Sequence, residues 1–322
     1  MVPRISIITP LYNKGLYIAE TIQSVLSQTE SNWELLVIDN LSTDDGFKVA
    51  QSFDDPRLKF LSNPIKGPGS TRNLGLNNAT GDWILYLDAD DLLEPDYLQL
   101  MLKEAEANPD AVVIASPWEE FRDQVNGQIT ELRFPAQPSG NTLNLEDTAI
   151  ANTCWAIHAA ITKRSWLKEI RWPTELDQFL AEDTAYWFRV VSGAKVAYTD
   201  YAGARYRTLT DDCRSDYNAV AWFEGNYKAM QSNIAYLSSL DRQPTAGQLE
   251  SLVRLYSSLY NRAKHEGANE ISSKALREAT YWLSLYDKNP ASPKFSMRVR
   301  SALGLKNFEA LRALLHFLRI RV

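Results

Sequence analysis

Short apolar runs alternate, along the first part of the chain, with longer segments in which apolar residues recur every three or four positions. Unbroken apolar runs bounded by turn residues are typical of strands buried on both faces, and the longer period is typical of helices. Strands that alternate with helices predict a mainly parallel sheet with helices on both faces. The predicted strands are 4–9, 33–38, 57–61, 83–87, 110–115 and 195–198, and the predicted helices are 17–28, 46–53, 95–107, 182–191 and one that ends at Asn78 after a loop over 66–73.

The pattern changes in the second part of the chain. Residues 118–125 and 128–134 flank Asn126-Gly127, a dipeptide that favours a β-hairpin, and a loop rich in Pro, Gly, Ser and Asn follows. Beyond Asp216 the periodicity is helical, over 217–240, 245–265 and 271–286. We therefore predict an α/β domain over residues 1–215 and a helical region over residues 216–322.

The composition is that of a soluble globular protein, with 45% hydrophobic and 23% charged residues among 322. No apolar run reaches the roughly 18 residues of a membrane-spanning helix, and the first residues enter a strand pattern without a signal peptide. The two cysteines, Cys154 and Cys213, favour a reducing compartment, and three histidines argue against a multi-histidine zinc site. A cytoplasmic location is therefore expected.

Charge is unevenly distributed along the chain. The net charge is -6, yet residues 290–322 carry seven Lys or Arg and a single acid. The acidic remainder argues against broad nucleic-acid binding. Residues 307–321 combine an apolar helical face with Arg312, Arg319 and Arg321, and such a helix can lie on the inner face of an anionic membrane. An alternative of equal weight is that residues 307–321 form a last helix that packs on the domain and leaves its basic side in solvent.

Three carboxylates follow the most apolar predicted strand. Residues 83–87 are an unbroken apolar run, and Asp88, Asp90 and Asp91 come directly after it. Open α/β sheets bind ligands at the carboxyl ends of strands, and clustered carboxylates are costly without a cation or hydrogen-bond donors. A hard divalent cation that also binds substrate phosphates would offset the repulsion. The alternative is a solvated acidic turn before the next helix.

Polar residues follow two other predicted strands. Asp39 ends the second strand and could accept a hydrogen bond from a ribose or from the N–H of a base. Residues 67–73 place small side chains, then Arg72 and Asn73, at the start of a helix, where anions are favoured. Residues 10–13 lack the glycines of a dinucleotide-binding turn. A dinucleotide-binding unit of the usual kind is therefore not expected. The alternatives are a strand-end turn at Asp39 and, for residues 67–73 taken alone, a surface loop with a solvated arginine.

Taken together, these segments resemble the motifs of family 2 glycosyltransferases. The resemblance covers roughly residues 3–207, and Thr71 stands where the family commonly has alanine. It implies a GT-A fold, which is a Rossmann-like, mixed, mainly parallel sheet flanked by helices. It also implies an inverting transferase that uses a nucleotide-diphosphate sugar, by family habit a UDP-sugar. The matching segments, in the family's order, are 7–13, Asp39, Gly67 with 71–75, 87–91 and 182–187.

The resemblance also implies roles for individual residues. Asp90 would bind Mn²⁺ or Mg²⁺ on the diphosphate, and Asp88 would contact the ribose or a water on the metal. Asp91 is a further candidate metal ligand. Asp183, with Glu182 in reserve, would be the base on the acceptor side, although two acids that open a helix also simply complement its dipole. Residues expected to bind the nucleotide-sugar are Pro10, Tyr12, Asn13, Asp39, Gly67, Arg72, Asn73, Asp88 and Arg207.

The expected partners are the donor and a glycan or lipid-linked acceptor, as in the synthesis of polysaccharide, glycolipid or other cell-surface glycan. A sugar nucleotidyltransferase is one alternative, but it would carry a glycine-rich loop containing arginine after the first strand. A non-catalytic relative that binds nucleotide-sugars is another. Such a relative would be expected to lack acids that are present here at both 88–91 and 182–183.

Overall fold

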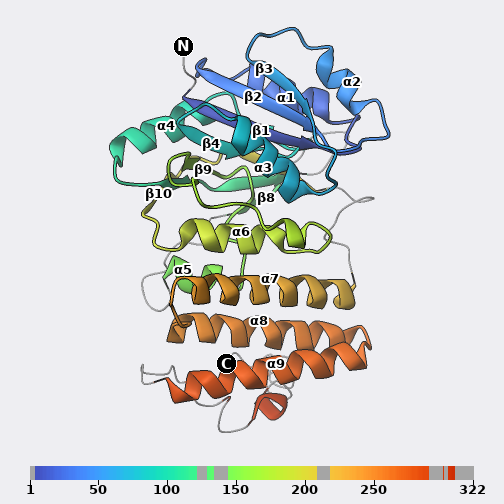
Figure 1. Ribbon diagram of the computed structural model, residues 1–322, viewed down its shortest axis with the longest axis vertical. Coiled ribbons are helices and arrows are strands. Elements are labelled where there is room, and N and C mark those ends of the chain that lie inside the picture. Colours follow the sequence, from blue (N-terminus) through green and yellow to red (C-terminus); the bar gives the residue numbers. More distant parts are fainter. Residues whose placement is uncertain are drawn as a thin grey trace. The chain divides into compact units, whose positions relative to one another are not determined.

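The computed structural model describes residues 4–121, 129–133, 144–208, 218–289, 300 and 304–308. The chain forms two compact units that interleave in the sequence (Figure 1). The first comprises Met1–Gln137, Thr153–Gln178 and Tyr186–Cys213, and the second comprises Pro138–Asn152, Phe179–Ala185 and Arg214–Val322. A domain boundary near residue 215 stays a prediction.

A seven-stranded mixed sheet forms the centre of the first unit. Within this sheet β9 is antiparallel to β4 and β6, whereas the other neighbouring strands are parallel, so the predicted mainly parallel sheet is confirmed. The order is β10-β6-β9-β4-β1-β2-β3. The strands are β1 (Ile5–Leu11), β2 (Trp33–Asp39), β3 (Leu58–Ser62), β4 (Trp83–Tyr86), β6 (Val113–Ala115), β9 (Ala160–Lys163) and β10 (Val196–Tyr198).

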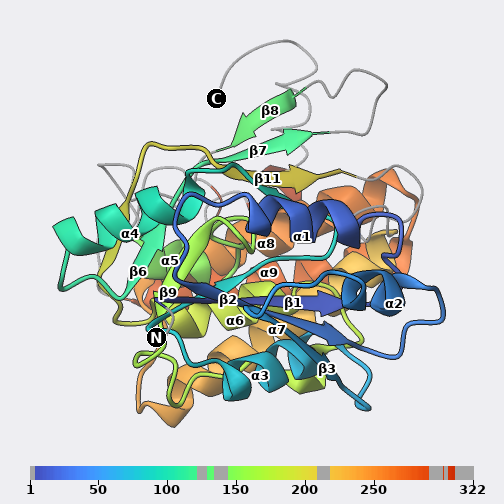
Figure 2. The ribbon, with the colours of Figure 1, turned by 90° about the horizontal axis from the view of Figure 1, so that it is seen from above.

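Helices cover both faces of this sheet, and Figure 2 shows α1 and α3 on opposite sides of strands β1 to β3. Helix α1 (Ile18–Leu26) buries Ile18, Ile22 and Val25, the apolar face that its sequence predicts. Helix α3 (Pro68–Asn78) begins inside the segment predicted as a loop. Proline at the first helical position explains the early start, because its fixed φ suits a first turn. The other helices are α2 (Gly46–Gln51), α4 (Tyr97–Ala107), the 3-10 helix η1 (Thr174–Leu176) and α6 (Glu182–Val191).

A second sheet in this unit has the order β5-β11-β7-β8. Its strands are β5 (Leu92–Leu93), β7 (Trp118–Phe121), β8 (Ile129–Arg133) and β11 (Ala204–Arg207). Strands β7 and β8 pair antiparallel, so the predicted hairpin pairing is confirmed, while its turn and the loop after it lie outside the described residues. Because β11 pairs with β5, the sheet brings Arg207 beside the chain that follows Asp91.

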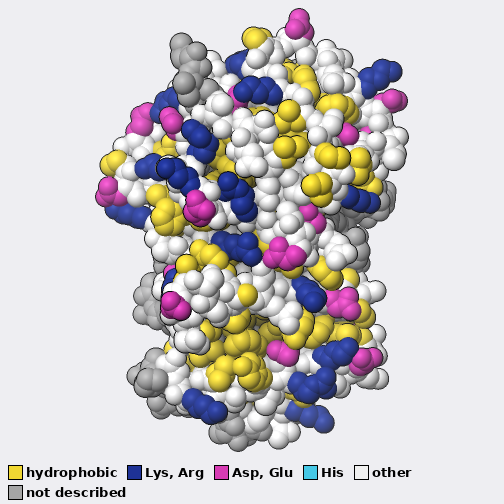
Figure 3. All heavy atoms as spheres, viewed as in Figure 1, with side chains coloured by type: hydrophobic (Ala, Val, Ile, Leu, Met, Phe, Trp, Pro, Cys, Tyr) yellow, Lys and Arg dark blue, Asp and Glu magenta, His cyan; other side chains and the backbone are white. Residues whose placement is uncertain are grey.

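The second unit is helical. It contains α5 (Leu145–Ala149), α7 (Ala219–Ser239), α8 (Ala246–His265) and α9 (Asn269–Lys288), and the last three match the predicted helices. Figure 3 shows hydrophobic side chains with basic ones beside them on the viewed face of these helices. Among the described residues, no helix is both long and apolar enough to cross a membrane. The predicted amphipathic segment lies almost entirely outside the described residues.

Candidate active site

The carboxyl ends of β1, β2 and β4 meet at one edge of the main sheet. Leu11 pairs with Asp39, and the next residue, Asn40, donates its backbone N–H to the Leu11 carbonyl at 2.8 Å. On the other side of β1, Leu87 donates its N–H to the Ile8 carbonyl at 3.0 Å. The turns that follow these strands are therefore neighbours, and this edge is where an open α/β sheet binds its ligand.

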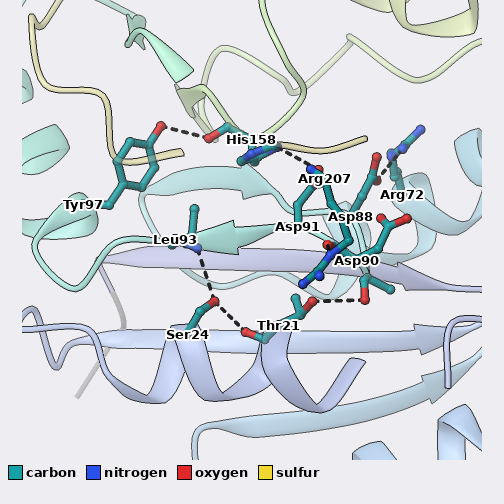
Figure 4. Close-up of polar contacts among 11 residues, drawn as sticks. Thr21, Ser24, Arg72, Asp88, Asp90, Asp91, Leu93, Tyr97, His158 and Arg207 are labelled. Carbon is teal, nitrogen blue, oxygen red and sulfur yellow. Dashed lines mark hydrogen bonds and ion pairs between the residues drawn. The ribbon is translucent and has the colours of Figure 1, made fainter. Parts of the chain in front are cut away.

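Asp88 and Asp90 each face one cation of the same unit. The guanidinium Nη2 of Arg72 lies 2.8 Å from Asp88 Oδ1 (Figure 4). The Lys14 ammonium lies 2.8 Å from Asp90 Oδ2. The Asp88 side chain is 32% exposed and that of Asp90 is 17% exposed, so solvent and ligands can reach both carboxylates. The two cations balance the charge that would otherwise make this pair costly.

Asp91 points into the protein, unlike its two neighbours. Its side chain is 1% exposed, Oδ1 accepts the Arg207 backbone N–H at 2.8 Å, and Oδ2 lies 3.1 Å from Nδ1 of His158 (Figure 4). Burial raises the pKa of Asp91 to about 6 against the attraction of His158, and Asp90 and Asp88 add to the rise. His158 is a fully buried, packed histidine, which leaves no surface for an acceptor.

The acid and the histidine form an interior pair. Burial by itself would lower the pKa of His158, but the adjacent Asp91 carboxylate, with Asp88, raises it. Because both pKa values are raised, the pair keeps a proton inside the protein near neutral pH. Within the described part of the chain, no three His, Cys, Asp or Glu side chains group closely enough to hold a metal. A cation at Asp88 and Asp90 would therefore need further ligands from the substrate or water.

Arg207 packs against residues 88–91, which we call the aspartate turn. Its side chain is 2% exposed, Nε donates to the Asp90 carbonyl at 2.6 Å, and Nη2 lies 2.6 Å from Glu20 Oε2. The guanidinium also lies over the rings of Tyr17, at 5.0 Å, and Phe121, at 4.7 Å. From α1, Thr21 donates to the carbonyl of Ala89. These contacts fix the backbone of the turn, and they place Arg207 beneath it rather than on its exposed side.

The side chain of Asp177 caps the N-terminus of α3. The Asp177 carboxylate accepts the backbone N–H groups of Gly69 at 2.7 Å and Ser70 at 3.0 Å. Gly67 has φ 145°, a conformation that favours glycine, and a Cβ there would lie 2.0 Å from Asp177 Oδ2. An internal carboxylate therefore satisfies the backbone donors of this helix end.

Two consecutive residues of α3 face different neighbours. Arg72 lies 4.4 Å above the Trp172 ring with its side chain 6% exposed, which holds the guanidinium rigidly against Asp88. The Asn73 amide exchanges two hydrogen bonds of 2.9 Å with the Trp172 backbone. The structure thus brings Arg72 to the aspartates, whereas Asn73 anchors the chain that carries Trp172.

The loop after β1 presents an open aromatic face near Asp39. The Tyr12 side chain is exposed, and Lys66 lies 5.2 Å from its ring centroid. Asn13 adopts φ 51° and accepts the Thr43 backbone N–H at 2.7 Å, which ties the loop to the one after β2. Pro10 lies in β1, one residue before the Leu11 that pairs with Asp39. This edge thus offers an exposed tyrosine ring, with Lys66 over it, and the Asp39 carboxylate.

Glu182 and Asp183 open α6, as predicted. Ala181, just before them, has φ 67°, a strained conformation for a residue with a Cβ, at a cost of about 1–3 kcal/mol. Asp183 Oδ1 accepts the Thr184 backbone N–H at 2.8 Å, and Glu182 is buried. These acids belong to the second unit, while the same helix continues from Tyr186 into the first.

Several residues at this edge were not predicted from the sequence. They are Lys14, Asp177 and Trp172, together with Tyr186, whose ring stacks on Trp172 at 3.9 Å and whose hydroxyl donates to Tyr86. Lys14 directly follows the predicted Asn13, so proximity in sequence was the one available signal. Asp177 and Trp172 depend on contacts between distant segments, for which a single sequence carries no local signal. Tyr186 lies within the segment 182–187 that resembles the family, but no role was predicted for it.

Comparison with known proteins identifies relatives of this chain. The sequence profile of Glycosyl transferase family 2 matches residues 6–171. An uncharacterized glycosyltransferase of Rickettsia conorii is 43% identical over 106 residues, 33% of this chain and 18% of that protein. Chondroitin synthase of Escherichia coli is 40% identical over 105 residues, 32% of this chain and 15% of that protein. The glycosyltransferase-family protein EpsH of Bacillus subtilis is 25% identical over 283 residues, 84% of this chain and 81% of that protein.

Solved structures show the same fold at low sequence identity. TarS residues 1–349 of S. aureus, solved with UDP-GlcNAc, is 18% identical with a TM-score of 0.58, over 90% of this chain and 93% of that one. The mannosyltransferase PcManGT of Pyrobaculum calidifontis, solved with GDP-Man and Mn²⁺, is 19% identical with a TM-score of 0.55, over 95% of this chain and 80% of that one. These likenesses confirm the GT-A type of fold.

Proposed function

Because this chain belongs to glycosyl transferase family 2, we propose that it transfers a sugar from a nucleotide-diphosphate sugar to an acceptor hydroxyl, with inversion at the anomeric carbon. The donor is a UDP-sugar and the acceptor is a glycan or a lipid-linked glycan. The products are polysaccharide, glycolipid or another cell-surface glycan. The similarity to chondroitin synthase and the fold shared with TarS, which was solved with UDP-GlcNAc, support this choice.

The observation that carries the proposal is the pair of partly exposed carboxylates, Asp88 and Asp90, that follows β4. Asp88 and Asp90 lie at the ligand-binding edge of the sheet. Asp88 is paired with the buried Arg72, and Asp90 is paired with Lys14. This mixture of acids and bases suits a diphosphate that carries a divalent cation, because each charge finds a partner of opposite sign. A purely structural acidic turn would not need Arg72, which is buried against Trp172.

The nucleoside is proposed to lie between the loops after β1 and β2. Tyr12 supplies an exposed aromatic face for the base, and Asp39 supplies a carboxylate for a base N–H or a ribose hydroxyl. Pro10 and Asn13 shape this surface from the β1 side. Gly67 and Asn73 support it indirectly, since Gly67 admits Asp177 at the start of α3 and Asn73 anchors the Trp172 backbone.

A divalent cation, Mn²⁺ or Mg²⁺, fits the donor set of Asp88 and Asp90. Hard cations prefer oxygen ligands and are often bound by one or two carboxylates together with substrate phosphates. The bound cation would neutralise charge that develops on the leaving diphosphate. Asp91 is better assigned to positioning than to coordination, because its two oxygens face Arg207 and His158. PcManGT, which shares the fold, was solved with Mn²⁺.

The chain's own residues would carry the transfer as follows. Asp183 removes the proton of the acceptor hydroxyl as that oxygen attacks the anomeric carbon, and Glu182 is the reserve candidate for this role. Arg72 stabilises negative charge on the departing nucleoside diphosphate. The bond from the anomeric carbon to the diphosphate oxygen breaks as the new bond forms on the opposite face. A single displacement of this kind inverts the configuration and needs no covalent enzyme intermediate.

A donor panel tests this function. UDP-sugars and GDP-sugars, with and without Mn²⁺, should raise the thermal unfolding temperature when bound, and slow donor hydrolysis should release the nucleoside diphosphate. Pyrophosphate release from a nucleoside triphosphate and a sugar phosphate would instead identify a nucleotidyltransferase. Binding without turnover by any donor would identify a non-catalytic relative.

Asp183→Asn tests the proposed base. This variant should lower kcat by at least about 10²-fold and leave the donor Kd close to wild type, because the lost group acts on the acceptor. Asp110→Asn, at a side chain that is 79% exposed, is the control and should transfer normally. Normal transfer by Asp183→Asn, or a product that retains the anomeric configuration, would contradict the mechanism.

A further inference from the structure

We propose that Lys14 couples metal binding to donor binding, by holding Asp90 in the free protein and moving to the diphosphate when donor and metal arrive together. The inference rests on the donor site proposed above. Its central observation is the 2.8 Å ion pair between Lys14 Nζ and Asp90 Oδ2, with exposed side-chain fractions of 26% and 17%. Each carboxylate that could bind a cation is thus already paired with a basic side chain, Asp90 with Lys14 and Asp88 with Arg72.

The position of Lys14 is built into the loops on either side of it. The Asp44 carboxylate accepts the backbone N–H of Gly15 at 2.7 Å through one oxygen and that of Gly46 at 3.0 Å through the other. The two glycines approach so closely that a Cβ on Gly15 would lie 3.1 Å from the Gly46 nitrogen. On the other side, Asn13 is tied to Thr43. The Lys14 backbone is therefore fixed, and only its flexible side chain is free to change partner.

The two cations at the carboxylates differ in mobility. Arg72 is buried, stacks on Trp172 and contacts Asp88 through one nitrogen, so it stays in place. Lys14 is a compact charge on a long flexible stem, with its ammonium also 5.8 Å from the Tyr17 ring centroid. Of the two, Lys14 is the cation that can leave its carboxylate at small cost.

Electrostatics then makes metal and donor cooperative. A divalent cation that binds without the donor must either displace Lys14 from Asp90 or bind close to the ammonium group, which repels it. A nucleoside diphosphate that arrives with the cation offers Lys14 new anionic oxygens, so the ammonium loses no partner when it releases Asp90. Each ligand should therefore strengthen the binding of the other by the same factor, as thermodynamic linkage requires. A passive surface ion pair would create no such coupling.

Mn²⁺ binding measured by electron paramagnetic resonance, with and without UDP, tests the proposal independently of activity. GDP is titrated in parallel, and the nucleotide that binds is used. In wild type the nucleotide should lower the Mn²⁺ Kd by at least about tenfold. In Lys14→Met the Mn²⁺ Kd of the free protein should fall about fivefold, the upper end of a partly exposed ion pair, and the nucleotide effect should shrink by a similar factor.

Two further variants separate the role of Lys14 from general effects. Lys14→Arg keeps a cation at the site and should preserve the wild-type coupling. Lys48→Met, on the exposed surface of α2, removes the same charge at a distance and should leave both Kd values unchanged. Lys14→Gln provides a second neutral side chain, and circular dichroism checks that each variant is folded.

Equal Mn²⁺ affinities and equal nucleotide effects in wild type and Lys14→Met would overturn the coupling role while leaving the donor site intact. Absence of Mn²⁺ binding in every protein, with and without nucleotide, would overturn the metal site of the proposed function together with this inference. If Lys14→Met without nucleotide bound Mn²⁺ more weakly than wild type, the coupling role of Lys14 would also be overturned, because the ammonium group would then favour metal binding.

Discussion

Replacing Arg207 by methionine tests whether this residue supports the aspartate turn or binds the donor diphosphate. Methionine keeps an unbranched apolar stem of similar reach, so the change removes the guanidinium without opening a large cavity. The variant loses the 2.6 Å hydrogen bond from Nε to the Asp90 carbonyl, which is partly buried, and the contact with Glu20. It also loses two aromatic faces beneath the guanidinium.

The expected destabilisation can be worked from these contacts. A hydrogen bond from a charged donor contributes about 1.5–3 kcal/mol. The pair with Glu20 adds at most about 1 kcal/mol, because the Glu20 side chain is 61% exposed. Each aromatic contact adds about 0.5–1 kcal/mol. Since neighbouring contributions are not additive, the free energy of unfolding should fall by about 2–4 kcal/mol, measured by urea denaturation.

Arg205 provides a matched control on the same strand. It pairs with Glu94 at 3.3 Å, lies over the same Phe121 ring and has a side chain that is 23% exposed. Its ion pair and its one aromatic contact should together make Arg205→Met cost about 0.5–2 kcal/mol, less than the loss expected for Arg207→Met. Equal losses of stability in the two variants would refute the supporting role of Arg207. A fully stable Arg207→Met protein that no longer binds donor would show instead that the side chain contacts the diphosphate.

Three further predictions concern stability and donor binding. Burial by itself would raise the pKa of Glu34, but hydrogen bonds, chiefly from Lys59, lower it to about 2. The ionised Glu34 side chain therefore stabilises the folded protein above pH 4.5, and this stabilisation is lost as the pH falls towards 2. Glu34→Gln should remove about 3 kcal/mol of this acid dependence in urea unfolding curves, and an unchanged curve would contradict it. Asp177→Asn should cost about 1–2 kcal/mol of unfolding free energy, with Glu175→Gln, on the same turn, nearly neutral; equal losses would contradict the cap. Asp39→Ala should weaken nucleotide binding by about 1–3 kcal/mol in calorimetry even without metal, and a loss seen only with metal would refute its role.

Local patterns in the sequence were sufficient to predict most of the fold. The apolar runs that became β1, β2 and β4 are buried along nearly their whole length, so both faces contribute to the signal. Strand β9 was missed, because it has only four residues and pairs with segments far from it in the sequence. Strand β11 was missed for the same reason, although Arg207 at its end was expected to bind the nucleotide-sugar.

The candidate site was predictable to the extent that its residues follow strands. Asp88, Asp90 and Asp39 stand where the end of a strand in the sequence indicates. Which carboxylate faces solvent and which turns inward was not predictable, because the choice depends on His158, 67 positions further along the chain. The partners of Arg72 and of the α3 N-terminus likewise come from Trp172 and Asp177, which only the folded chain brings into contact.

The insertion of β9 between β4 and β6 has a consequence for the order in which the protein is assembled. During synthesis β4 and β6 emerge well before residues 160–163, yet in the folded sheet they pair with β9 and not with each other. Until β9 arrives, each of the two strands exposes an unpaired edge, and such edges are templates for aggregation. A nascent chain or fragment that stops before residue 160 should therefore be more prone to self-association than one that extends through β10, which pairs with the other edge of β6.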